Sequence, residues 1–344
     1  MRPISQLTSE TPPPEVIRYA FRSFDRQWLL ADQRIIGRPR PQLWHSSSAK
    51  QLFAVSTSSL GNGPAIVTTP QIPDFHFFNN LGGKDIIPLY RDAAVTEPNV
   101  THGLLDLLNG TFGEMVTPED VISYITGVLG HPGFTEHFHD ELEVPGPRVP
   151  LTRDRILFRR AVEIGQQVIA WQTYAERFPK AIGTTQGQVP AGNARVLTDI
   201  PDDPDKYPDT LRDDVRYADK LRELHVGEGI FGDVAPEVWA YEDSGLRVVR
   251  SWLGYRMKDR AGRRSSPLDD IRPERWTWEM TRELQDLLWV LEGVIALEPA
   301  QDELLTEIIA GDLFLSSDLP TPTDAEREPP GVDRRQQLGF ELGL

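Results

Sequence analysis

The chain has 344 residues, of which 39% are hydrophobic and eight are tryptophan, so it can build a core and global disorder is excluded. Its net charge of −16 argues against non-specific nucleic-acid binding, which normally needs a basic excess, and the absence of cysteine excludes disulfides, thiolate catalysis and cysteine-ligated zinc. We find no apolar run of about 18 residues and no signal-peptide pattern at the start, so we expect a cytoplasmic protein without a membrane segment.

The first third of the chain has the pattern of short strands. Residues 1–15 are polar and predict a flexible leader. After them, apolar and β-branched runs alternate with turn residues such as those at 61–64, which predicts a β-rich lobe over residues 16–115. The predicted strands are 16–21, 52–55, 65–67 and 85–90.

A helical period begins after residue 115. Thr117 followed by Pro118 and two acids is a strong helix start, since it combines a capping side chain, proline at the first position and acids in the first turn. We predict a mainly helical lobe over 116–312 with a mixed segment at 179–271, and a disordered acidic tail over 313–344. The other predicted helices are 134–142, 153–178, 276–296 and 301–309. The predicted strands of this part are 194–197, 229–231 and 246–249.

The fold class that follows is α+β, with a β-rich N-terminal lobe and a mixed helical C-terminal lobe. No P-loop, glycine-rich nucleotide loop, amino-methylating motif or Gly-x-Ser-x-Gly elbow occurs in the sequence. We therefore expect no enzyme activity and no cofactor. His131, His137 and His139 lie close in sequence, but positions 137 and 139 point to different faces of a helix, so surface or packing roles are favoured over a metal site.

Several short strings resemble, in order, the C-terminal specificity domain of Type ISP restriction–modification enzymes. Each string alone is weak, whereas the ordered series over about 18–295 is specific. The strings are YAFRSFDRQW at 19–28, RPRPQLW at 38–44, IPDFH at 72–76, PNVT at 98–101, VTPEDVISYI at 116–125, RVPL at 148–151, PEVW at 236–239 and LDDI at 268–271.

The resemblance implies a bilobed target-recognition domain that reads double-stranded DNA. In that family the domain follows an adenine-N6 DNA methyltransferase domain, and full-length members carry a nuclease and an ATP-driven motor upstream. The expected partners are therefore double-stranded DNA and a DNA methyltransferase subunit or domain. The departures are Ser23 in place of proline, the acidic balance and the acidic tail.

Reading a duplex needs cations on phosphates and polar side chains on base edges. The candidate phosphate contacts are Arg256, Lys258, Arg260, Arg263 and Arg264. The candidate base readers are Arg38, Arg40, Gln71, His76, Asn79 and Asn80, with the serines at 46–48 beside them. DNA recognition further predicts that the arginines converge into one positive face.

Structural roles compete with these assignments. Arg22, Asp25 and Arg26 are expected to form internal ion pairs, Asp74 and His76 can simply cap a turn, and the tryptophans are expected in the core. Two other functions remain open. One is an interaction subunit of a modification or anti-phage complex that does not touch DNA, and the other is a metal-dependent hydrolase built on the histidines.

Overall fold

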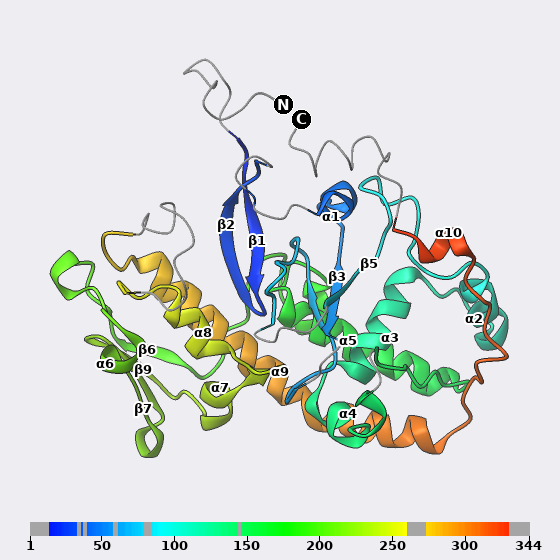
Figure 1. Ribbon diagram of the computed structural model, residues 1–344. Helices are drawn as coiled ribbons and strands as arrows, with labels where there is room; N and C mark the ends of the chain where they lie inside the picture. Colours follow the sequence, from blue (N-terminus) through cyan, green and yellow to red (C-terminus); the bar gives the residue numbers. More distant parts are fainter. Residues whose placement is uncertain are drawn as a thin grey trace.

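The computed structural model describes residues 14–32, 36, 40–57, 61–78, 84–143, 146–259 and 273–329. These residues form several small antiparallel sheets and a set of helices (Figure 1), so the predicted α+β class is confirmed. One long helix, α9 (Trp278–Ala310), crosses the molecule and packs against both of its halves. One half contains residues 195–254, and the other contains the helices between residues 104 and 172.

The strands form four sheets with the orders β1-β2, β4-β3-β5, β6-β9-β8-β7 and β10-β11. All pairings between these strands are antiparallel. Their bounds are β1 Val16–Arg22, β2 Asp25–Leu30, β3 Phe53–Thr57, β4 Val67–Thr69, β5 Lys84–Pro88, β6 Arg195–Thr198, β7 Val215–Ala218, β8 Glu223–Val226, β9 Gly229–Gly232, β10 Glu242–Asp243 and β11 Leu246–Arg247.

The remaining helices range from single turns to the 18 residues of α5. The α-helices are α1 Pro41–Ser46, α2 Leu104–Phe112, α3 Pro118–Leu129, α4 Pro132–His137, α5 Arg155–Gln172, α6 Leu211–Asp214, α7 Pro236–Ala240, α8 Val248–Gly254 and α10 Asp324–Arg327. The 3₁₀ turns are η2 Glu141–Glu143, η3 Pro179–Ile182, η4 Pro204–Lys206 and η5 Asp219–Leu221.

Helix α9 joins two hydrophobic cores. Its first half, including Leu287 and Leu291, packs with the four-stranded sheet, α7 and α8, whereas Leu304 and Ile308 pack with α2, α3 and α5. The sequence predicted two helices here, separated near Pro299. The structure instead continues one helix through Pro299, because burial on both sides outweighs the one backbone hydrogen bond that proline cannot donate.

The predicted helix start at Thr117 is confirmed by a full capping box, in which the Thr117 hydroxyl accepts from the Asp120 N–H and the Asp120 carboxylate accepts from the Thr117 N–H. The helix predicted over 153–178 is shorter. Helix α5 ends at Gln172 because Tyr174 and Ala175 have positive φ values of 53° and 60°. Burial of Tyr174, whose hydroxyl donates to the Phe24 carbonyl at 2.7 Å, stabilises this break.

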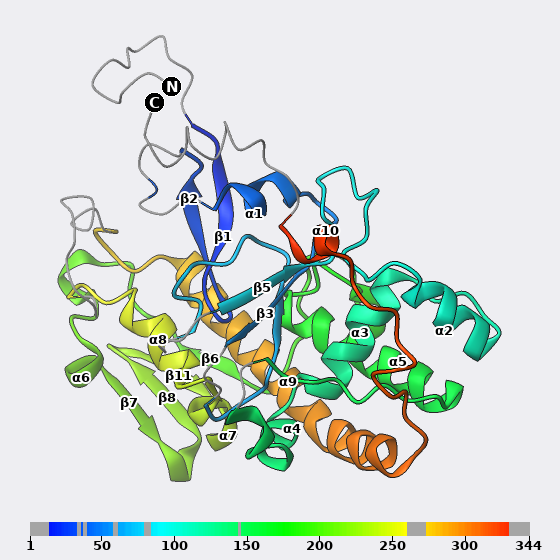
Figure 2. The same ribbon diagram turned by 45° about the vertical axis from the view of Figure 1, so that its right-hand side comes forward.

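The β1–β2 hairpin lies between the two halves of the molecule (Figures 1 and 2). Strand β1 was predicted, whereas β2 and its register, with Arg18 opposite Trp28, were not. At the turn, the Ser23 hydroxyl donates to the buried Asp243 carboxylate, and Phe24 packs edge-to-face on Tyr241. These contacts hold the hairpin against the β10–β11 turn.

Part of the segment expected to be a disordered tail has a defined place. Phe314 is buried, and α10 has its own capping box at Thr323. The Arg91 guanidinium donates to the carbonyls of Glu326 and Glu328, which fixes α10 beside the end of β5 (Figure 2). Residues 330–344 lie outside the described residues.

Candidate nucleic-acid interface

The structure describes five of the eleven predicted DNA contacts. Arg40, Gln71, His76, Arg256 and Lys258 have defined positions. The other six lie outside the described residues: Arg38, Asn79, Asn80, Arg260, Arg263 and Arg264.

Arg40 and His76 come together on one exposed patch around Phe75. Arg40 precedes α1, and its guanidinium lies over the Phe75 ring at 5.4 Å from the centroid. The His76 imidazole meets the same ring edge-on, with 5.0 Å between centroids. The Asp74 carboxylate accepts from the His76 backbone N–H at 2.7 Å and so sets the turn, as expected. We call Arg40, Phe75 and His76 the loop patch.

Gln71 and Arg256 do not present their polar groups to solvent. The Gln71 amide donates to both oxygens of Glu176 at 2.9 Å. Arg256 is 9% exposed and donates to Asp25 at 2.9 Å and to the Trp252 carbonyl at 3.1 Å. Withdrawing Arg256 would deprive the buried Asp25 of its counter-charge, and withdrawing Gln71 would remove two hydrogen bonds from the half-buried Glu176, so we assign both side chains to holding the fold.

Arg22 connects the loop patch to the segment after α8. Its guanidinium lies 3.5 Å from Asp74 and donates to the Tyr255 hydroxyl at 2.8 Å. Tyr255 precedes Arg256, and exposed Lys258 follows with its ammonium 4.0 Å from Asp209. Within the described residues, the structure therefore brings residues 74–76 and residues 255–258, which are parts of the predicted base-reading and phosphate-contact segments, to the same end of the hairpin.

Sequence reasoning missed an exposed aromatic side chain on the hairpin. Trp28 is 64% exposed and Trp278 is 58% exposed, so the expectation that they are core residues is wrong. The guanidinium of Arg18, which is opposite Trp28 in the ladder, lies 4.1 Å from the Trp28 ring centroid. The cross-strand register could have predicted this pair if β2 had been recognised. Trp252 and Trp276 are buried, as expected.

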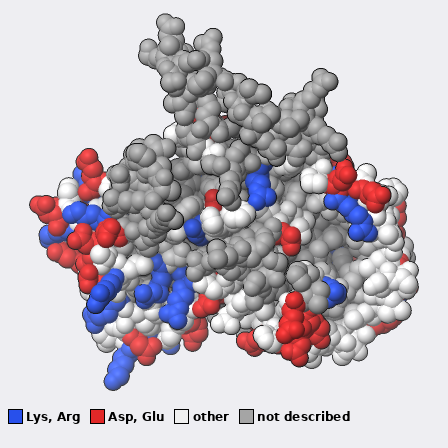
Figure 3. All heavy atoms as spheres, viewed as in Figure 1, with Lys and Arg blue, Asp and Glu red and all other residues white. Residues whose placement is uncertain are grey.

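On the side of the molecule that Figure 3 shows, the described cations do not form one continuous positive face. Figure 3 shows Lys and Arg side chains in separate groups, with acidic side chains between them and over α4. The expected ion pairs of the hairpin are confirmed, because Arg22 pairs with Asp74, Arg26 with Glu176, and Asp25 with Arg256. In the folded protein, acidic residues distant in the chain neutralise arginines that form a basic stretch in the sequence.

The histidine segment has a packing role at His131. This side chain is fully buried, with Nδ1 3.0 Å from Asp302 on α9 and Nε2 3.1 Å from the Val128 carbonyl. Burial lowers its pKa, and Asp302 opposes that shift. Among the described residues no group of three or more potential ligands could hold a metal ion. Within the same part of the chain, no helix is long and apolar enough to cross a membrane.

Asp243 provides a prediction about pH. Burial raises its pKa from 3.8 to about 7, and the hydrogen bond from Ser23 opposes the shift. The native state therefore holds a proton that the unfolded chain releases, so stability falls as pH rises between about 4 and 7 and levels off above that window. We expect Asp243→Asn to remove roughly 2–3 kcal/mol of this loss between pH 5 and pH 8.

Urea unfolding at both pH values measures this effect. The amide keeps an acceptor for Ser23 but cannot ionise, so its unfolding free energy should depend less on pH than that of the parent protein. An identical pH dependence in the two proteins would contradict the raised pKa.

The fold and the loop patch define a mixed α+β domain with polar, cationic and aromatic loops gathered at one end of a hairpin. The family model for the Type ISP C-terminal specificity domain matches residues 2–287. The chain therefore belongs to the Type ISP C-terminal specificity domain family. A search of curated proteins found no match.

Three solved structures have a similar fold. A cryo-EM structure of a DrdV–DNA complex has a TM-score of 0.61 at 17% identity, covering 85% of this chain and 28% of that one. The Type ISP restriction–modification enzyme LlaBIII bound to DNA has a TM-score of 0.59 at 15% identity, covering 87% and 19%. A nuclease-deletion mutant of the Type ISP enzyme LlaGI with a DNA substrate mimic has a TM-score of 0.55 at 16% identity, covering 86% and 21%. The chain spans less than a third of each of these proteins.

Proposed function

We propose that the chain is the sequence-specific double-stranded DNA recognition module of a Type ISP-like restriction–modification system. It supplies specificity to an adenine-N6 DNA methyltransferase and nuclease that this chain does not contain, and it has no catalytic centre of its own. The family match over residues 2–287 carries this proposal. The three similar structures are complexes with DNA or with a DNA mimic, which supports it.

The loop patch gives the proposal candidate contacts. Arg40 has no ion-pair partner among the described residues, so its guanidinium can turn from Phe75 to a guanine edge, which it matches with two hydrogen bonds. Phe75, at 37% exposed, offers an apolar surface beside it. Of the residues outside the described part, we retain Arg38, Asn79 and Asn80 as base readers and Arg260, Arg263 and Arg264 as phosphate contacts, with Lys258 beside them.

Selection from a pool of random duplexes tests the function. The chain is incubated with the pool alone and together with its methyltransferase partner, and the bound fraction is sequenced. We expect one short sequence to be enriched in at least one condition. The absence of enrichment in both conditions would reject DNA recognition. It would favour the alternative of an interaction subunit that does not touch DNA, which the net charge of −16 and the paired arginines support.

Arg40→Ala tests the base-reading role. We expect discrimination at one position of the selected site to fall by about 10- to 100-fold, because one bidentate arginine–guanine pair provides about 1–3 kcal/mol. Binding to a scrambled duplex should change little. Fluorescence anisotropy on the selected duplex and its single-base variants measures both quantities.

Arg160→Ala is the matched control. Arg160 is a surface arginine whose guanidinium pairs with Glu303 and Glu307, away from the loop patch. It should bind DNA as the parent protein does. Arg40→Ala could instead weaken the affinity for every duplex equally and reduce the slope of log affinity against log salt concentration by about 1. That result would identify Arg40 as a phosphate contact.

A further inference from the structure

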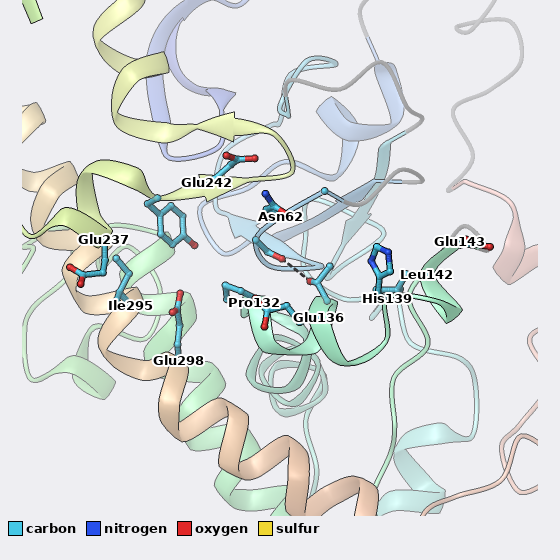
Figure 4. Close-up of a pocket in the computed structure, with 14 residues that line it drawn as sticks. Asn62, Pro132, Glu136, His139, Leu142, Glu143, Glu237, Glu242, Ile295 and Glu298 are labelled. Atoms are coloured by element: carbon cyan, nitrogen blue, oxygen red, sulfur yellow. Dashed lines mark hydrogen bonds between the residues drawn. The ribbon is translucent and has the colours of Figure 1, made fainter. Parts of the chain in front are cut away.

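A cavity of about 580 Å³ lies between α4, the loop at 61–63, the β10 strand, α7 and α9 (Figure 4). Its lining contains five glutamates from these separate elements and the η2 turn. They are Glu136, Glu143, Glu237, Glu242 and Glu298. Among the described residues, no lysine or arginine lines the cavity, and His139 is its basic side chain. The nearest cation to any of the five in the described ion pairs is Arg247, which lies 4.0 Å from Glu242.

Two of these carboxylates lie on the same side of the cavity, and neither has an ion-pair partner among the described residues. Figure 4 shows Glu298 on α9 and Glu136 on α4 at the same side of the cavity. Burial, together with the smaller effect of the negative charges of Asp302 and Glu136, raises the pKa of Glu298 from 4.5 to about 7. The facing wall supplies further acidic side chains, Glu237 and Glu242, and behind them lie the buried Asp243 and Tyr241. None of these four side chains carries a positive charge. Among the described residues, no ion pair compensates Glu136, Glu143 or Glu237, so the cavity carries negative charge that Arg247, beside Glu242, balances only in part.

A buried hydroxyl in the cavity wall gives a second, independent indication of a ligand. Tyr241 is 6% exposed and lines the cavity, and its hydroxyl has no hydrogen-bond partner among the described residues. Buried hydroxyls in native proteins nearly always have a partner. Pro299 also has no N–H to give to the carbonyl of Ile295, another lining residue. The wall thus contains a buried neutral polar group without a partner among the described residues, the Tyr241 hydroxyl, beside the carboxylates.

The walls of the cavity are held in place by hydrogen bonds to backbone carbonyls of the loop at 61–63. The Ser244 N–H donates to the Asn62 carbonyl at 2.8 Å, and the Thr135 hydroxyl donates to the Gly63 carbonyl at 2.7 Å (Figure 4). Gly63 has a φ of 102°, and a Cβ there would lie 2.4 Å from the Glu242 carbonyl oxygen. A preformed wall lowers the entropy cost of binding.

We propose that this cavity binds an organic cation, with ammonium or guanidinium groups on a flexible aliphatic chain. The carboxylates are too dispersed for one metal ion, since the described residues contain no group of three potential ligands. A chain with separated N–H donors can reach Glu136, Glu298 and the Tyr241 hydroxyl together. This chemistry is found in a free polyamine and in an arginine side chain of a protein partner. The proposal does not depend on DNA recognition.

Isothermal titration of the full chain at low salt with two probes tests the proposal. The probes are spermidine and N-acetyl-arginine methylamide. We expect saturable 1:1 binding of at least one of them. Binding of spermidine alone assigns the cavity to a free polyamine, and binding of the arginine derivative assigns it to a protein side chain. If neither probe binds in a saturable manner, the proposal is wrong.

Charge-matched variants separate this site from general attraction to an acidic protein. The double variant Glu136→Gln with Glu298→Gln should weaken binding by about tenfold or more, because charge-assisted hydrogen bonds are lost. The control, Glu303→Gln with Glu307→Gln, makes the same charge change on α9, where both glutamates pair with Arg160. An equal loss in the two double variants would overturn the proposal. Tyr241→Phe should also weaken binding, while a purely structural tyrosine would leave affinity unchanged.

Discussion

Gly165→Ala is expected to destabilise the protein by about 4 kcal/mol or more, the largest effect of any single substitution considered. Helices α3 and α5 cross where Gly127 faces Gly165, and a Cβ on Gly165 would lie 1.7 Å from the Ser123 carbonyl oxygen. That atom belongs to the backbone of α3, which is buried in the core shared with α2, α5 and the second half of α9, and it cannot rotate away. The helices would have to separate, which opens voids in a close-packed interior.

Gly110→Ala is the matched control for this prediction. Gly110 is an exposed position of α2, and a Cβ there meets nothing within 4 Å. Alanine has the higher helix propensity, so this substitution should stabilise the protein by roughly 0.5–1 kcal/mol. Urea unfolding followed by circular dichroism measures both variants, and soluble yield compares them if Gly165→Ala does not fold. A stability of Gly165→Ala within about 1 kcal/mol of the parent would contradict the close crossing.

Arg256→Met is expected to destabilise the protein by about 3–5 kcal/mol, because it leaves a buried carboxylate without its counter-charge. Asp25, at 2% exposed, would keep only the weaker hydrogen bond from the Gln27 amide at 3.2 Å. The Arg256 guanidinium also lies 3.6 Å from the Trp252 ring centroid and donates to the Trp252 carbonyl. Its loss would loosen the hairpin from α8 and so displace the loop patch indirectly.

Lys258→Met distinguishes this structural role from a DNA-contact role. Lys258 lies two residues further along the chain, is exposed, and lies 4.0 Å from Asp209, so its loss should change stability by less than about 0.5 kcal/mol. In the DNA experiments Lys258→Met should weaken binding to all duplexes alike. If Arg256→Met is as stable as the parent and binds all duplexes more weakly, Arg256 contacts phosphate instead.

The amino-acid sequence by itself determined the local features of this protein. Thr117 and Pro118 specify the start of α3, because the capping side chain and the fixed φ of proline act within one turn. The alternation at 16–21 specified β1, and an ordered set of short strings identified the family to which the chain belongs. The capping and alternation signals depend only on residues a few positions apart in the chain, and these can be read directly from the sequence.

Only the tertiary structure decided which charges remain available. Arg40 and Arg256 both occur in basic stretches, yet one lies exposed over Phe75 and the other is buried against Asp25, 231 residues away. The fold likewise made one helix through Pro299 and placed glutamates from distant segments around one cavity. The physical reason is that Coulomb energy and burial depend on how close residues lie in space. The separation of two residues along the sequence does not determine their distance in space.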